Sequence, residues 1–81
     1  MSLLDAAWAI REAMKVCGQA EDMIAAGALG DVLRDTLRYA DELLDVADEE
    51  LVGAHPPNHL VMTAATPLLR ARVRVLRDRA G

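Results

Sequence analysis

The sequence has few large side chains with which to build a core: in 81 residues there is no phenylalanine, one tryptophan and one tyrosine. A single chain of this size buries only about 60% of the surface that its unfolded form exposes. Hydrophobic residues make up 53% of the chain, but many are alanines, which favour helices and let them pack closely. The composition therefore predicts a tightly packed helical unit with a thin core, to which a second copy would add burial.

The sequence also has a single cysteine, Cys17. One cysteine cannot form an internal disulfide or make a metal site by itself. His55 and His59 are four residues apart, a spacing that suits a metal site on a helix, but the two prolines between them disrupt helical geometry. We expect these histidines to lie in a loop or a cap, and we predict no metal and no cofactor.

Catalytic motifs are missing as well. Ser2 is the only serine, and neither Ser2 nor Cys17 lies near a histidine and an orienting acid in the sequence. The sequence therefore shows no arrangement for nucleophilic catalysis. The sequence contains no glycine-rich phosphate-binding motif, and the acidic runs at 21–22 and 48–50 are expected to be solvated. The sequence therefore predicts a protein that is not an enzyme.

Long apolar runs and a basic leader are absent too. The first five residues, Met1 to Asp5, do not form a cationic start followed by an apolar run. No stretch approaches the roughly 20 consecutive apolar residues that a membrane-spanning helix needs. We therefore expect a cytoplasmic protein that does not bind membranes.

Residues 3–26 have the spacing of a first helix. Ser2 is a suitable N-cap, and Asp5 places a negative charge in the first turn. The apolar stripe, with 4-3-4-3 spacing, contains Leu3, Ala7, Ile10, Met14 and Cys17. Gly18 costs about 1 kcal/mol of helix propensity, but the apolar stripe continues beyond it, so we expect one helix rather than two.

Residues 31–52 carry the clearest helical pattern. One apolar stripe contains Leu33, Leu37, Ala40, Leu44, Ala47 and Leu51, and a second stripe beside it contains Val32, Tyr39, Leu43 and Val46. The opposite side is charged, with Arg38 and Glu42 placed to pair at i,i+4. The apolar half is too wide for one neighbour to cover, so we expect contact with at least two other helices. The short loop at 27–30 makes the first helix an antiparallel partner.

Residues 53–58 are predicted to form a turn, because two consecutive prolines remove backbone donors. A helical segment follows at 59–80. Thr66 and Pro67 are typical of an N-cap and the first position of a helix, so we expect a short helical turn at 59–65 and a restart at 67. The alternative is a single helix with a kink at Pro67.

Five of the nine basic residues lie near the end of the sequence: Arg70, Arg72, Arg74, Arg77 and Arg79. The first three alternate with apolar residues, which is the period-two pattern of a strand. However, a lone strand needs a partner that the rest of the chain does not offer. On a helix, Leu69, Val73, Leu76 and Ala80 form one apolar stripe, so we favour a helix over a strand for residues 69–76.

Charge is divided along the chain. Residues 1–58 carry twelve acidic and four basic side chains, whereas residues 59–81 carry five arginines and one aspartate. We expect the arginines to lie over acidic residues such as Asp41, Asp45 and Asp48, in the same copy or in a second one, with exposed pairs contributing about 0 to 1 kcal/mol each. Nucleic acid is a less favoured target, because aromatic residues do not alternate with the arginines and the remaining acidic surface would repel a polyanion.

Trp8 falls among charged residues of the first helix, with Leu4 as its apolar neighbour. Because tryptophan is enriched among interface anchors, Trp8 and Leu4 either contact a partner chain or pack beneath the third segment. Tyr39 similarly marks either an interface rim or the edge of the core. The candidate partner or dimer interface consists of Leu4, Trp8, Tyr39, Leu43 and Val46, and the five arginines are the candidate contact for nucleic acid or an acidic partner.

Together these patterns predict an all-α single domain over residues 1–81: an antiparallel helical hairpin and a shorter third helical segment, completed as a homodimeric bundle. The function expected first is a non-enzymatic protein-binding module, such as a regulator, adaptor or inhibitor, acting through helical faces. One alternative is a nucleic-acid-binding regulator that uses the arginine cluster. Another is an inhibitor whose acidic second helix imitates a phosphate backbone and occupies a nucleic-acid-binding protein, as small phage-encoded inhibitors do.

Overall fold

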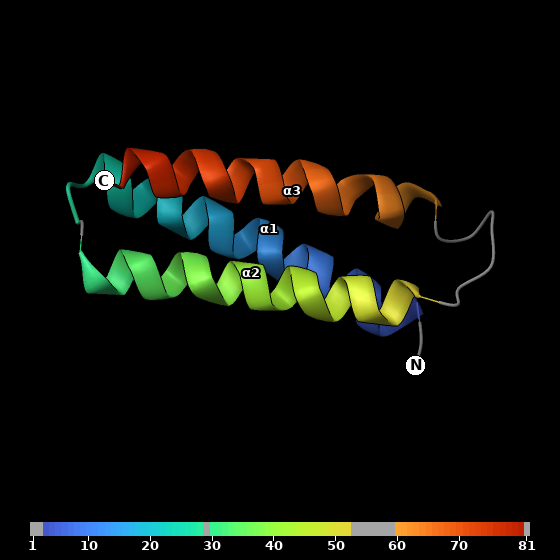
Figure 1. Ribbon diagram of the computed structural model, residues 1–81. Coiled ribbons are helices and arrows are strands. Elements are labelled where there is room, and N and C mark those ends of the chain that lie inside the picture. The colour runs from blue at the N-terminus through green and yellow to red at the C-terminus, as the bar shows by residue number, and fades with distance from the viewer. Residues whose placement is uncertain (1–2, 29, 53–59, 81) are drawn as a thin grey trace.

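The protein is an elongated bundle of helices in a computed structural model that describes residues 3–28, 30–52 and 60–80. The helices are α1 (Leu3–Ala25), α2 (Asp31–Leu51) and α3 (Leu60–Arg79). The bundle measures 42 × 17 × 15 Å, with α1 and α3 running in one direction and α2 against both (Figure 1). Each helix contacts the other two, so α2 has the two neighbours that its wide apolar half predicted. The predicted all-α three-helix unit is confirmed.

The core lies where one apolar stripe from each helix meets the others. From α2 it takes the whole of the predicted first stripe, Leu33, Leu37, Ala40, Leu44, Ala47 and Leu51. From α3 it takes Leu69, Val73 and Leu76, together with Thr66, and from α1 it takes Ala6, Ala9, Ile10, Ala13, Val16, Cys17 and Ala20. The many alanines of α1 let the α2 leucines pack close to its backbone, as the composition predicted.

The buried stripe of α1 differs from the predicted one. Met14, expected in the core, exposes 51% of its surface, and Ala7 is only half-buried, whereas Ala6, Ala13 and Val16 are buried. The helix is therefore rotated from the expected orientation. The physical reason is that alanines lie on several sides of α1, so the small side that permits the closest approach faces the leucines, and the longer Met14 side chain lies at the edge.

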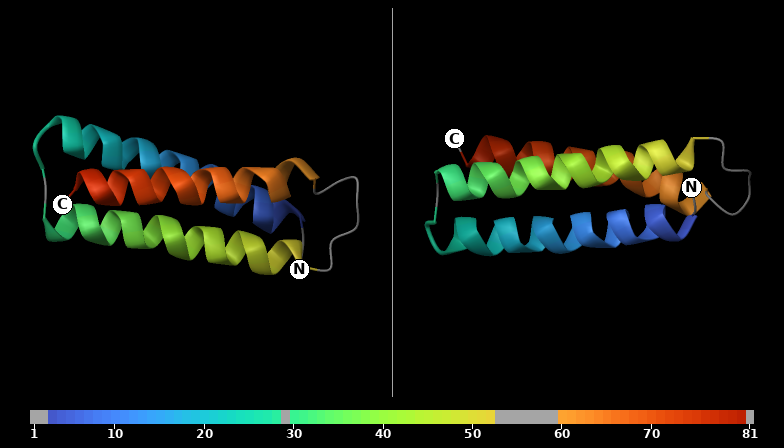
Figure 2. Two further views of the ribbon diagram at one scale, coloured as in Figure 1. Left: turned by 45° about the horizontal axis from the view of Figure 1, so that its top comes forward. Right: turned by 90° about the horizontal axis from the view of Figure 1, so that it is seen from below.

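The connection from α1 to α2 begins with a hydrogen-bonded cap. The Ala28 backbone N–H donates to the Met23 carbonyl oxygen at 2.8 Å, and the Gly27 N–H donates to the Ile24 carbonyl oxygen at 3.0 Å. This pattern closes a helix with a left-handed residue, and Gly27 has a φ of 76°. The chain then turns back sharply enough to lay α2 antiparallel to α1 (Figure 2).

The third helix continues through Pro67, so the expected restart at 67 is wrong and the single-helix alternative is correct. The Thr66 hydroxyl donates to the Thr63 carbonyl oxygen, the group that the missing Pro67 N–H leaves without its usual helical partner. Residues 69–76 are helical, as expected. The predicted turn at 53–58 and both histidines lie outside the described residues.

Candidate functional site

Ion pairs join α2 and α3. The Arg70 guanidinium Nη2 lies 2.8 Å from Asp45 Oδ1 and 2.6 Å from Asp48 Oδ2. Two turns closer to the end of α3, Arg77 pairs with Asp41. The hydrogen bonds to Asp48 and Asp45 raise the pKa of Arg70 further above its usual range. The predicted pairing of the arginine-rich segment with the acidic helix is confirmed within one chain.

The remaining arginines of α3 face elsewhere. Arg72 pairs with Glu21 of α1 and so fixes the position of α3 along α1. Arg74 and Arg79 are exposed, and neither forms an ion pair within residues 3–28, 30–52 and 60–80. The structure thus separates the five candidate contact residues into three that are engaged by carboxylates of the same chain and two that remain exposed.

On the outer side of α2, two further arginines pair along the helix. Arg34 Nη1 lies 3.4 Å from Asp31 Oδ1, and Arg38 Nη2 lies 2.5 Å from Asp35 Oδ1. The expected pair between Arg38 and Glu42 is not formed, because the Arg38 side chain extends toward the preceding turn. Glu42 therefore keeps its charge uncompensated within the part of the chain that the structure describes.

The second apolar stripe of α2 lies at the edge of its contact with α1. The Thr36 hydroxyl donates to the Met23 sulfur of α1 at 3.8 Å, which places this side of α2 next to α1. Val32, Tyr39 and Val46 follow the same side further out, and they expose 70%, 43% and 41% of their surfaces. We call these three residues the Tyr39 face.

Carboxylates flank the Tyr39 face on both sides. Glu42 and Glu49 are exposed, and each lies three or four residues from Tyr39 or Val46, the spacing of neighbours on a helix surface. On α1, Glu12 lies three turns before Met23, on the side of that helix that meets α2. None of these three glutamates forms an ion pair with another described residue.

The other predicted interface residues have different positions. Trp8 is 49% exposed and lies one turn before Glu12 on α1. Leu43 is buried in the core, so a partner cannot reach it. The Leu4 side chain lies outside the described residues. Trp8, Tyr39 and Val46 are thus the predicted interface residues that the structure leaves open to a partner.

A second exposed apolar surface lies on the opposite flank of α1, and sequence reasoning missed it. Leu68 and Val75 of α3 are 72% and 55% exposed, and Met14 of α1 is 51% exposed. Leu68 and Val75 lie on either side of Arg72 and follow one side of α3, whereas Met14 lies two turns before Glu21, the α1 partner of Arg72. We call Leu68 and Val75 the Leu68 face. Its sequence signal is the seven-residue spacing of Leu68 and Val75.

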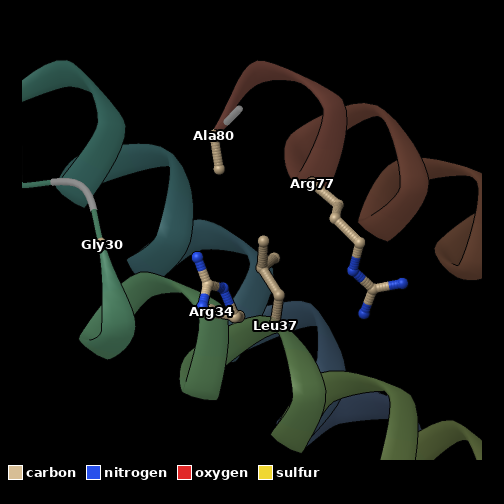
Figure 3. Close-up of a pocket in the computed structure, with 5 residues that line it drawn as sticks. All are labelled: Gly30, Arg34, Leu37, Arg77 and Ala80. Atoms are coloured by element: carbon tan, nitrogen blue, oxygen red, sulfur yellow. The ribbon is translucent and has the colours of Figure 1, made fainter.

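A pocket of about 250 Å³ lies between the start of α2 and the end of α3, lined by Gly30, Arg34, Leu37, Arg77 and Ala80. Leu37 points from α2 toward α3, between the two arginine side chains (Figure 3). Each of these guanidinium groups is already bound to a carboxylate, Arg34 to Asp31 and Arg77 to Asp41. The lining residues therefore provide no uncompensated cation to attract an anion.

Cys17 is fully buried in the core, as predicted. Burial raises the pKa of its thiol, an effect that the positive charge of Arg72 partly opposes. Among the described residues, no three histidine, cysteine, aspartate or glutamate side chains come together in a way that could hold a metal ion. Of the three helices, none has both the length and the apolar character that crossing a bilayer requires, within the part of the chain described.

Comparisons with protein families, with curated proteins and with solved structures give no match for this chain.

Proposed function

We propose that this chain is a non-enzymatic protein-binding module, a small regulator, adaptor or inhibitor, and that it binds its protein partner through the Tyr39 face. The observation that supports this proposal is the exposure of Val32, Tyr39 and Val46 along one side of a helix whose adjoining side is fully buried. Contiguous exposed apolar side chains mark interaction sites in soluble proteins, and tyrosine is enriched among the residues that dominate binding energy.

The charges around the Tyr39 face specify the chemistry of the partner. Glu12, Glu42 and Glu49 surround the apolar residues and have no ion pair within the described part of the chain. A partner surface with an apolar centre and basic residues at its edges would pair with all three carboxylates. An amphipathic helix laid against α1 and α2 would have this arrangement.

The ion pairs favour this proposal over the two alternatives. A nucleic-acid grip would use Arg70, Arg72 and Arg77, but these side chains already neutralise carboxylates of the same chain. A phosphate mimic would use the acidic side of α2, but Asp41, Asp45 and Asp48 are bound by arginines of α3. Either function would require these contacts to be broken first.

Affinity capture with the full chain as bait tests the proposal. Replacing Tyr39 and Val46 together with serine is expected to abolish capture of proteins that bind the natural chain, because the apolar centre of the face is lost. Val52→Ser is the matched control, since Val52 is 78% exposed and lies outside the Tyr39 face. Capture of the same proteins by the double variant, with its helix content and melting temperature preserved, would refute the proposal.

A further inference from the structure

We draw no further inference here: the strongest candidate, the exposed apolar surface of Leu68 and Val75 on α3, carries none, because nothing in the structure shows what covers it.

Discussion

The Thr66 hydroxyl donates a hydrogen bond of 3.3 Å to the Thr63 carbonyl oxygen, one turn back along α3. In an uninterrupted helix this carbonyl would accept from the N–H of residue 67, which is a proline and has none. Thr66 is 5% exposed, so the carbonyl lies in a part-buried setting where a lost partner is costly. The hydroxyl thus replaces the missing backbone donor where α3 passes through Pro67.

This relationship predicts a specific coupling between Thr66 and Pro67. Thr66→Val keeps the shape of the side chain but removes the donor, and we expect it to lower the free energy of unfolding by about 1 to 2 kcal/mol. In a Pro67→Ala background the same change should cost less than about half as much, because the alanine N–H then serves the Thr63 carbonyl. Urea unfolding of the natural chain, the two single variants and the double variant gives the coupling free energy between Thr66 and Pro67. Equal costs in both backgrounds would show that the hydroxyl does not replace the proline donor.

The fold was largely predictable because the pattern of α2 is unambiguous. Its leucines and alanines repeat over about five turns on one side, and charged residues occupy the other. This pattern predicts the helix, its buried side and its contact with two neighbouring helices. The pairing of Arg70 and Arg77 with α2 was also predictable, since the opposite charges are concentrated in separate parts of the sequence. Because the acidic and basic residues lie in separate parts of so short a chain, they can pair within the fold in few other ways.

Other features depend on three-dimensional detail that spacing does not contain. Alanines lie on several sides of α1, so their spacing does not show which side is buried. The close approach of α1 and α2 decides that Val16 lies in the core and Met14 does not. In α3, the Thr66 hydroxyl binds the carbonyl that Pro67 leaves without a backbone donor, which spacing does not reveal. The exposure of Tyr39 and Val46 depends on how much of the apolar side of α2 is covered by α1. Periodicity identifies an apolar side, but not how much of it a neighbouring helix covers.

Arg70 is predicted to contribute more to stability than the other arginines of α3. It bridges two carboxylates of α2, and its side chain is 34% exposed, so solvent screens the contact only in part. Arg70→Met should lower the free energy of unfolding by about 1 kcal/mol at low salt. Arg74→Met is the matched control and should change it by less than about 0.5 kcal/mol, since Arg74 has no ion pair among the described residues.

Salt provides the second measurement for Arg70. Because the contact is partly screened already, raising the ionic strength to about 1 M should reduce the difference between Arg70→Met and the natural chain. A difference that persists unchanged at high salt would mean that the methylene groups of Arg70, rather than its charge, hold α3 against α2.

Cys17 is predicted to be unreactive in the folded chain and to make stability fall at alkaline pH. Its thiol is fully buried, and burial raises its pKa in the folded state. A group whose folded-state pKa is raised contributes stability below its unfolded pKa and loses it as the pH rises through the folded value. The free energy of unfolding should therefore decline above about pH 8.5, where the unfolded thiol begins to ionise.

The Cys17→Ala variant isolates this contribution. The difference in unfolding free energy between the natural chain and the variant should shrink as the pH rises from neutrality to above about 9. An aromatic disulfide reagent should modify Cys17 at the rate of unfolding rather than at the rate of a free thiol. Rapid modification of the folded chain at neutral pH would contradict the burial of Cys17.

Two glycine-to-alanine changes are predicted to have opposite effects. Gly18 lies inside α1, and a Cβ added there meets nothing within 4 Å, so Gly18→Ala should raise the free energy of unfolding by about 1 kcal/mol through helix propensity. Gly27 has a φ of 76° in the cap that ends α1, so Gly27→Ala should lower it by about 1 kcal/mol although no atom lies within 4 Å of the added carbon. Since both sites have open space, the sign is decided by backbone conformation alone. Urea unfolding at a concentration where the chain is monomeric measures both, and a loss of stability in Gly18→Ala would mean that this turn of α1 is not the regular helix described.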